Sequence, residues 1–329
     1  MIKKFFLIMK TIRVNEFGGP EVLKLEEADA FSPQAGEVLV RVKAIGVNPY
    51  DTYMRSGAYG ARNPTLPYTP GSDASGLVES VGPDITDLAI GDRVFTTGTI
   101  TGAYAEFALC TRSQVHPLPQ QLSFAEGAGI WVPYGTACRA LFQLAQAQPG
   151  DWVLIHGASG GVGTAALQWA RAAGMKIIGT AGSERGLELV KAEGAQYAFD
   201  HRSPDYQKQI LETTNGEGVN VILEMLANIN LGSDLKLLAS AGRVIVIGSR
   251  GDVTITPRDL MARQASVIGM IVWNTPEADV LSIHAALKAG LKNGTLRPKV
   301  GLELPLASAE KAHRKIMEPG AFGKIVLVA

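Results

Sequence analysis

The sequence predicts an α/β protein that combines a mainly β domain with a doubly wound parallel sheet. The chain has 329 residues, more than one domain usually holds, and 46% of them are hydrophobic. Short β-rich segments broken by glycine and proline fill residues 11–121, whereas strands and helices alternate from residue 151. A glycine-rich turn joins the first of these later strands to a helix.

The equal numbers of basic and acidic residues limit the kinds of partner that the chain is expected to bind. Lysine plus arginine total 31, as do aspartate plus glutamate, so the net charge at pH 7 is zero. Such a chain has no bulk attraction to nucleic acid or an anionic membrane, and neither is expected as a partner. No hydrophobic run approaches the length of a membrane span. Cys110 and Cys138 are too few for a disulfide framework and favour the cytoplasm.

The opening Met1–Lys10 superficially resembles a secretory signal, because two lysines precede the apolar run Phe5–Met9. The run is too short, and no cleavage site of small residues follows it. Met9 is an alternative start, since the first strand pattern, Thr11–Val14, begins just after it.

The β-rich region contains strand patterns such as Glu37–Val47 and Ser75–Gly82. Beyond it, apolar runs of four to six residues predict parallel strands that are buried on both faces. Helix-start signals lie between them, for example Thr256 followed by Pro257. The six expected strands are Trp152–His156, Lys176–Thr180, Tyr197–Asp200, Val221–Met225, Arg243–Gly248 and Ser266–Met270.

After residue 270 we expect a helix that opens at Thr275-Pro276, with Val280, Ile283, Leu287 and Leu291 on one face. A last helix and a terminal strand, Lys324–Ala329, follow. These residues are too few for an independent domain, so we expect them to pack onto the N-terminal part.

The octet His156–Gly163 (HGASGGVG) directly follows a predicted strand and opens a helical pattern. Small residues at this point let the backbone turn sharply and approach a pyrophosphate, which the amides of the helix N-terminus can bind. Compared with G-x-G-x-x-G, Ala158 replaces the first glycine, while Gly160 and Gly163 keep the other two. The octet predicts a dinucleotide site, the alternative being a purely structural turn.

Residues 157–161 also satisfy G-x-S-x-G, the nucleophile elbow of α/β-hydrolases. A hydrolase needs a downstream acid and then a histidine, for which His201, His284 and His313 are available by order alone. The elbow explains neither Gly163 nor the regular strand–helix units that follow, so we favour the dinucleotide interpretation.

The end of the second predicted strand bears on the choice of dinucleotide. NAD sites usually carry an acid there that binds the ribose 2′-hydroxyl. Here Gly182 and Ser183 follow the strand, and Arg185 and His201 lie nearby in the expected layout. This favours NADP, because a carboxylate would repel the 2′-phosphate. Glu184 leaves the alternative open, since it would favour NAD if it reached the ribose.

Seven dispersed segments carry a family resemblance: Glu16–Leu25, Gly46–Gly57, Leu66–Asp73, Gly91–Thr96, His156–Gly163, Glu224–Leu231 and Gly242–Gly251. Together they resemble the medium-chain dehydrogenase/reductase superfamily and, within it, the zinc-independent quinone oxidoreductases of the zeta-crystallin type. The resemblance implies a GroES-like catalytic domain made of residues 1–127 and 271–329. A Rossmann dinucleotide-binding domain, residues 128–270, is then inserted between them.

The resemblance also implies NADPH as cofactor and assigns residues by position. Tyr53 and Asn48 are the candidate catalytic residues beside the nicotinamide, although Tyr53 could instead be an aromatic packing contact. Asn230 matches a cofactor contact, with helix capping as its alternative. The full set of implied cofactor contacts is Tyr53, Ser159, Gly160, Gly161, Val162, Gly182, His201, Asn230, Ile247, Gly248, Ser249, Arg250, Met270, Ile271 and Val272.

Zinc enzymes of the superfamily carry a cysteine in G-x-C-G-x-D and a His-Glu pair in G-H-E. The corresponding stretches here are Gly46-Val47-Asn48-Pro49 and Gly71-Ser72-Asp73, which lack the cysteine and the histidine. We therefore predict no metal site. None of the five histidines has metal-ligand spacing: His116, His156, His201, His284 and His313.

Without a Lewis acid to polarise a carbonyl, alcohol oxidation is not expected, whereas a quinone spreads incoming charge over two oxygens. The resemblance thus implies an NADPH-dependent quinone oxidoreductase that is a homodimer or homotetramer. One alternative is an NADPH-dependent reductase of α,β-unsaturated carbonyls, since both acceptors are conjugated. Another is a crystallin or RNA-binding protein with secondary activity, to which the zero net charge lends no support.

Overall fold

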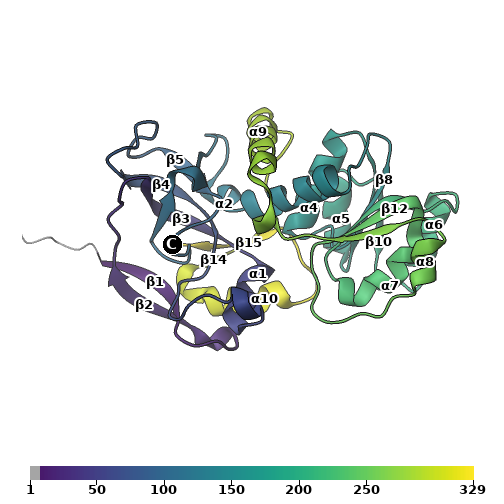
Figure 1. Cartoon of the computed structure of the whole chain (residues 1–329), viewed down its shortest axis with the longest axis horizontal. Helices are drawn as coiled ribbons and strands as arrows, with labels where there is room; N and C mark the ends of the chain where they lie inside the picture. Colours follow the sequence, from purple (N-terminus) through teal and green to yellow (C-terminus); the bar gives the residue numbers. More distant parts are fainter. Residues whose placement is uncertain (1–7) are drawn as a thin grey trace, which may run out of the picture. The chain divides into compact units, whose positions relative to one another are not determined.

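The computed structural model describes residues 8–329. Of the signal-like opening Met1–Lys10, residues 1–7 lie outside the described residues, whereas residues 8–10 belong to the first strand, which therefore begins before the predicted Thr11. The chain forms two compact units, each drawn in Figure 1. Among the described residues, unit 1 consists of residues 8–132, Pro298–Glu318 and Lys324–Ala329, and unit 2 of Pro133–Arg297 and Pro319–Gly323.

Unit 2 is built on a six-stranded parallel sheet with the order β10-β9-β8-β11-β12-β13. All six predicted strands are present, which confirms the doubly wound fold, and their apolar runs suit strands covered on both faces. The strand order changes direction between β8 and β11, where such folds bind their ligands. The strands are β8 (Trp152–Ile155), β9 (Lys176–Ala181), β10 (Tyr197–Asp200), β11 (Val219–Glu224), β12 (Leu238–Val246) and β13 (Ser266–Gly269).

Helices connect these strands and flank the sheet (Figure 1). One apolar core joins strand side chains such as Leu154 and Ile222 to Ile210 and Leu231 on two of the helices. Burial of this core holds the strand ends, and therefore the loops after them, in fixed positions. The helices are α4 (Gly161–Ala172), α5 (Glu184–Ala192), α6 (Tyr206–Thr213), α7 (Ala227–Leu237) and α8 (Pro257–Met261).

Helix α9 (Glu277–Asn293) also belongs to unit 2, and it buries Ile283, Leu287 and Leu291 of its predicted apolar face. The expected domain boundaries lay at 127/128 and 270/271, whereas the compact units divide at 132/133 and place residues 271–297 in unit 2. The reason is local packing. Arg139 pairs with Asp279 at 3.9 Å, and the Gln143 amide donates to the Asp279 carbonyl at 3.1 Å.

Unit 1 contains a two-stranded sheet, β1-β2, and a seven-stranded sheet ordered β14-β15-β3-β4-β5-β7, with β6 paired to β3. Strand β15 (Lys324–Val328) pairs antiparallel with β3 (Glu37–Val47), so the two ends of the chain share one sheet. The other strands are β1 (Ile8–Val14), β2 (Leu23–Asp29), β4 (Asp73–Val81), β5 (Arg93–Thr96), β6 (Phe107–Thr111), β7 (Val115–Pro117) and β14 (Val300–Pro305).

Helix α1 (Pro49–Ser56) follows β3 directly and positions several candidate residues. Asn48 and Asp51 form a capping box at its start, and Gly57 ends it with a φ of +75° that favours glycine. Unit 1 also contains the short α2 (Phe124–Gly127) and the later helix α10 (Ala309–Met317).

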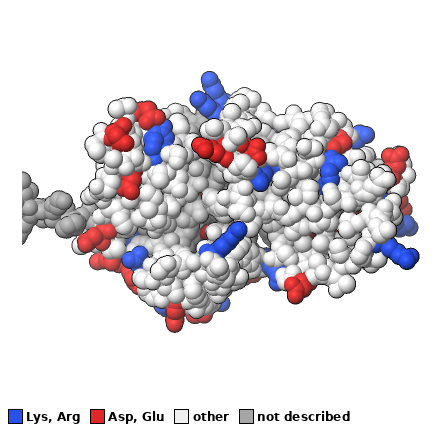
Figure 2. All heavy atoms as spheres, in the orientation of Figure 1, with Lys and Arg blue, Asp and Glu red and all other residues white. Residues whose placement is uncertain are grey.

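Charged side chains of both signs are mixed over the face drawn in Figure 2. No helix between residues 8 and 329 is both long and apolar enough to cross a membrane.

Candidate functional site

The glycine-rich octet lies between β8 and α4, as predicted. A Cβ on Gly163 would lie 2.4 Å from the carbonyl oxygen of Gly157, so the close packing of the helix on the turn requires glycine there. Gly160 is the N-cap of α4, and Gly161 and Val162 open the helix. The first amides of this 12-residue helix have no partner within it, which makes its N-terminus suitable for an anion.

The segment Pro319–Gly323 lies against this turn. The Ser159 hydroxyl donates to the Ala321 carbonyl at 2.7 Å, and the Gly323 amide donates to the Ser159 carbonyl at 2.7 Å. The Arg185 guanidinium lies 3.6 Å from the centre of the Phe322 ring. Ser159 thus holds the chain rather than pairing with a histidine, which argues against the hydrolase alternative.

Strand β9 ends at Ala181 and is followed by Gly182, so neither position provides a carboxylate. A Cβ on Gly182 would lie 2.8 Å from Nε2 of His201, so the imidazole packs directly on this glycine. Glu184 is exposed at the start of α5, and Arg202 pairs with Asp200 at 2.8 Å. Desolvation lowers the pKa of His201, which leaves its ring neutral at pH 7.

The carboxyl ends of β12 and β13 line an open pocket of about 330 Å³. Val272 is buried beside this edge, and the Arg250 amide donates to the Asn228 side chain at 2.9 Å. Five of the predicted cofactor residues therefore lie around one pocket, at the edge where dinucleotides bind in such sheets. The five are Ile247, Gly248, Ser249, Met270 and Ile271.

Asn230 lies inside α7, three residues after its start, and therefore does not cap a following helix. Its Nδ2 donates to Oε1 of Glu224 at 3.2 Å. Glu224 is the last residue of β11 and is completely buried. Asn230 thus points to a buried acid that no motif in the sequence indicates.

His156, Glu224 and Asp234 form a cluster that we call the buried trio. His156 Nε2 lies 2.9 Å from Oδ1 of Asp234 and 3.7 Å from Oε2 of Glu224, while His156 Nδ1 lies 3.3 Å from the Thr180 hydroxyl. Burial lowers the pKa of His156, but the two acids outweigh it and bring the value to about 9. These residue types also bind metals. However, the 2.9 Å separation is that of a hydrogen bond between nitrogen and oxygen.

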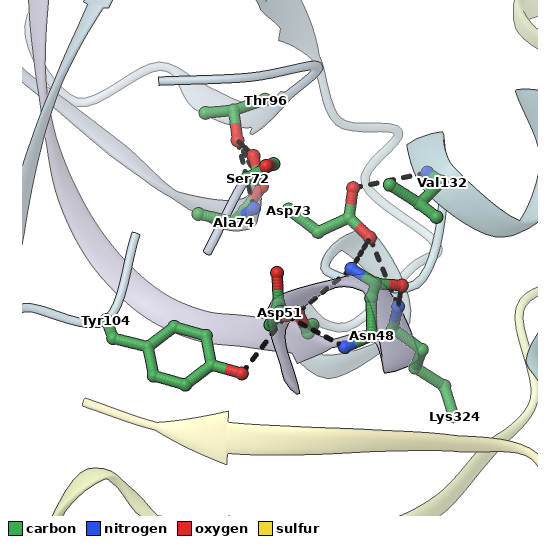
Figure 3. Close-up of polar contacts among 10 residues, drawn as sticks. Asn48, Asp51, Ser72, Asp73, Ala74, Thr96, Tyr104, Val132 and Lys324 are labelled. Carbon is green, nitrogen blue, oxygen red and sulfur yellow. Dashed lines mark hydrogen bonds and ion pairs between the residues drawn. The ribbon is translucent and has the colours of Figure 1, made fainter. Parts of the chain in front are cut away.

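In unit 1, Asn48 and Asp73 surround the ammonium group of Lys324, as Figure 3 shows. Lys324 Nζ donates to Oδ1 of Asn48 at 2.5 Å and to Oδ2 of Asp73 at 3.1 Å, and Nδ2 of Asn48 donates to the same Asp73 oxygen at 3.0 Å. Lys324 and Asn48 are each 4% exposed and Asp73 is 1% exposed. We call these three residues the Lys324 cluster.

A chain of hydrogen bonds continues beside this cluster. Because arginine can only donate, Arg55 donates to Nδ1 of His313 (3.2 Å), and Nε2 of His313 donates to the Tyr104 oxygen (3.0 Å). Tyr104 in turn donates to Asp51 at 3.2 Å (Figure 3). Burial, with Arg55 adding to it, lowers the pKa of His313 to about 3, and burial raises the pKa of Asp51 to about 7.

Tyr53 lies on α1 and is partly buried, with its ring centre 6.1 Å from that of Tyr59. The same helix contributes Tyr50, Asp51 and Met54 to a cavity of about 420 Å³. The two predicted catalytic residues thus differ in setting, since Asn48 has its amide engaged in the Lys324 cluster whereas Tyr53 is partly open to solvent.

Comparison with known proteins shows what this architecture resembles. Residues 161–286 match the zinc-binding dehydrogenase family, and residues 34–120 match the alcohol dehydrogenase GroES-like domain. The quinone oxidoreductase of Rattus norvegicus is 49% identical over 98% of each chain. The chain belongs to the quinone oxidoreductase family. It is therefore an oxidoreductase of the medium-chain dehydrogenase/reductase superfamily, with a GroES-like domain and a Rossmann sheet.

Solved structures agree with this assignment. The Escherichia coli quinone oxidoreductase in complex with NADPH is 28% identical with a TM-score of 0.88, over 97% of this chain and all of that one. A structure described as an NAD-dependent alcohol dehydrogenase is 30% identical with a TM-score of 0.90, over 97% and 99%. The same fold thus occurs in proteins described with different cofactors and substrates, so the fold alone does not determine either.

One matching family is described as zinc-binding, and the residues of the Lys324 cluster test whether that metal fits. Lys324 places a buried ammonium between Asn48 and Asp73 and donates to both. A second cation at this position would meet the positive charge of Lys324 and would lack thiolate or imidazole ligands. The donor set does not fit zinc.

The sequence patterns alone do not identify Lys324, Glu224 and Asp234 as residues of the candidate sites. Lys324 lies 276 residues from Asn48, a separation that no local pattern bridges. A signal existed for Glu224 and Lys324, since each is a charged residue within or beside an apolar strand. Such residues need a buried partner or a function.

Proposed function

We propose that this chain is an NADPH-dependent quinone oxidoreductase that works without a metal ion. The observation that carries the proposal is the buried Lys324 ammonium between Asn48 and Asp73, which places a positive charge beside the two stretches that correspond to the ligand segments of zinc enzymes. The names of relatives such as the rat protein support quinones as substrates, and the NADPH complex of the Escherichia coli relative supports the cofactor.

In this proposal unit 2 binds the dinucleotide along the carboxyl edge of its sheet. The pyrophosphate meets the amides at the start of α4, within Ser159–Val162. Gly182 and His201 receive the adenosine 2′-phosphate, because the site has no carboxylate at the end of β9. The remaining contacts come from Asn230, Ile247–Arg250 and Met270–Val272.

Unit 1 supplies the catalytic residues. NADPH, when bound, supplies a hydride to a conjugated acceptor. The Tyr53 hydroxyl donates a hydrogen bond to the acceptor oxygen on which charge develops, and solvent water provides the proton. Asn48 acts by position, because its amide is held by Lys324 and Asp73 while it caps the helix that carries Tyr53.

We further propose that the protein is a cytoplasmic homodimer or homotetramer. Cys110 and Cys138 are both free and buried, which supports a reducing compartment. Light scattering on the purified protein tests the assembly, and the mass of a single chain would contradict it.

A single set of titrations and turnover assays tests the proposal. We expect NADPH to bind at least about tenfold more tightly than NADH, and Tyr53→Phe to lower quinone turnover by about tenfold or more. Tighter binding of NADH would contradict the assignment of Gly182 and His201. If the protein reduced α,β-unsaturated ketones but no quinone, its substrates would be enones and not quinones. Zinc that purifies in stoichiometric amount and restores activity after chelation would contradict the metal-free proposal.

A further inference from the structure

Glu224 connects the two loops that follow β11 and β12. Its main-chain carbonyl accepts hydrogen bonds from the amides of Ile247 at 2.8 Å and Gly248 at 3.2 Å. Its side-chain Oε1 accepts from the Leu226 amide and from Nδ2 of Asn230 at 3.2 Å. Three predicted cofactor contacts are thus tied to one buried residue.

The second carboxylate oxygen of Glu224 faces another acid. Glu224 Oε2 and Asp234 Oδ2 are both buried, and neither has a hydrogen-bond partner among residues 8–329. Glu224, Asp234 and His156 each offer an atom within 4.8 Å of the others. Two carboxylates so close repel each other unless a proton lies between them, and one shared proton satisfies both unpartnered oxygens.

The charge balance of the trio requires the same proton. Because the two acids raise the pKa of His156 to about 9, its ring is protonated at pH 7 and contributes one positive charge, which balances only one of the two carboxylates. An uncompensated buried charge is strongly unfavourable. Burial raises the pKa of Glu224 to about 7, in agreement with this count. The other titratable groups that face the trio are Tyr206 of α6 and His201 after β10.

We propose that Glu224 is a positioning residue for the cofactor: its neutral side chain donates from Oε2 to Asp234, so that Oε1 remains an acceptor and fixes the Asn230 amide. With Nδ2 held by Glu224, Oδ1 of Asn230 is turned away from it and accepts from a donor group of the dinucleotide. The positioning role rests on the proposed NADPH binding, whereas the location of the proton does not.

Infrared spectroscopy of the cofactor-free protein tests the proton. In the difference spectrum of wild type minus Glu224→Gln, we expect the carbonyl stretch of a neutral carboxylic acid at about pH 6, and we expect this band to disappear as the pH rises above about 7. Asp51, whose pKa is also raised to about 7, is present in both proteins, so its band cancels in this difference spectrum. The control Glu217→Gln, on the exposed surface of unit 2, gives no such band. Absence of the band in the Glu224 difference overturns the proposal.

NADPH titrations test the positioning. Glu224→Gln preserves both the donor and the acceptor, so we expect its affinity for NADPH to lie within about twofold of that of wild type. The affinity of wild type should decline above about pH 7, where Glu224 loses its proton, whereas that of Glu224→Gln should not. Glu224→Met removes the acceptor and should weaken NADPH binding about tenfold, as should Asn230→Ala. The double variant should bind no more weakly than Asn230→Ala alone, because both changes remove one shared contact.

Several outcomes contradict this role. Loss of affinity in Glu224→Gln equal to that in Glu224→Met would mean that the carboxylate charge, and not the proton, is needed. Losses that add in the double variant would reduce Glu224 to a structural residue. If the wild type contained a stoichiometric metal and Asp234→Asn did not, a metal ion, and not a proton, would lie between the two acids. If the wild type binds no NADPH, the proposed function itself is refuted. The variant patterns above concern only the role of Glu224, so the two failures can be told apart.

Discussion

Lys324 is buried at the start of β15, with its ammonium between Asp73 and Asn48. A lysine in such a place needs compensation, because desolvation of an ammonium is costly. Asp73 provides the opposite charge, while Oδ1 of this aspartate accepts from the Val132 amide at 3.2 Å. The same contacts hold the start of α1, so the charge pair and the position of Tyr53 depend on each other.

Removal of this ammonium should therefore destabilise the protein. Lys324→Met leaves the Asp73 carboxylate buried without its partner, and we expect a loss of about 3–5 kcal/mol in the free energy of unfolding. Urea denaturation measures it. Lys311→Met, at an exposed position of α10, is the control. Equal stability of the two variants would contradict the pairing, whereas Asp73→Asn added to Lys324→Met should recover part of the loss.

His201 should couple NADPH affinity to pH. Its pKa is lowered, so the ring is neutral at pH 7 and gains a proton only below about pH 6.5, where its charge would attract the 2′-phosphate. Affinity for NADPH should rise as the pH falls from about 7 to about 5.5. Fluorescence titration measures this, with NADH as the control that lacks the phosphate. A flat profile in wild type, or an unchanged one in His201→Gln, would contradict the role.

At the scale of elements, the unit β8–turn–α4 depends on close packing. Gly163 has no room for a side chain, since a Cβ would lie 2.4 Å from the Gly157 oxygen and 2.5 Å from the Ala158 Cα. Both neighbours are backbone atoms, which cannot rotate away. The helix therefore approaches the turn closely enough to aim its first amides at one point.

Gly163→Ala should push α4 away from the turn. We expect a stability loss of about 2 kcal/mol or more and weaker NADPH binding, measured by thermal unfolding and titration. Gly232→Ala is the matched control, because the nearest neighbour of its Cβ would be the Thr254 oxygen at 3.5 Å. At this helical position alanine should gain about 0.5–1 kcal/mol. Similar behaviour of the two variants would contradict the packing argument.

The elements of unit 2 could be predicted because each buried strand leaves a local mark in the sequence. The run Val221–Met225 predicted β11, and the small residues of the octet predicted the turn. The sequence of this strand could not reveal the partner of Glu224, because Asp234 lies ten residues away on a helix whose orientation depends on packing. The apolar face of α9 was predicted too, but a face does not identify the surface that covers it.

For the molecule as a whole, the shifted pKa values determine how stability varies with pH. The pKa of His156 is raised from 6.5 to about 9, so the folded chain holds this proton more tightly than the unfolded chain. Its contribution is complete below pH 6.5 and is lost as the pH rises through about 9. His313, with its pKa lowered to about 3, acts in the opposite sense and only below pH 6.5.

Stability should consequently fall between about pH 7 and pH 9, by on the order of 3 kcal/mol. Chemical denaturation at several pH values measures the slope. Asp234→Asn removes the main attraction for the His156 proton and should flatten the decline, while also lowering stability at pH 7. A wild type whose stability rises over this interval would contradict a charged His156.

The four residues 321–324 serve both candidate sites. Ala321 and Gly323 bind Ser159 in the glycine turn, and the next residue supplies the ammonium beside Asn48. During synthesis from the N-terminus, neither the cofactor turn nor the charge pair can be completed until this stretch has left the ribosome. A nascent chain that has already formed every strand of the parallel sheet would still lack both, so ligand binding should appear only after that sheet has formed.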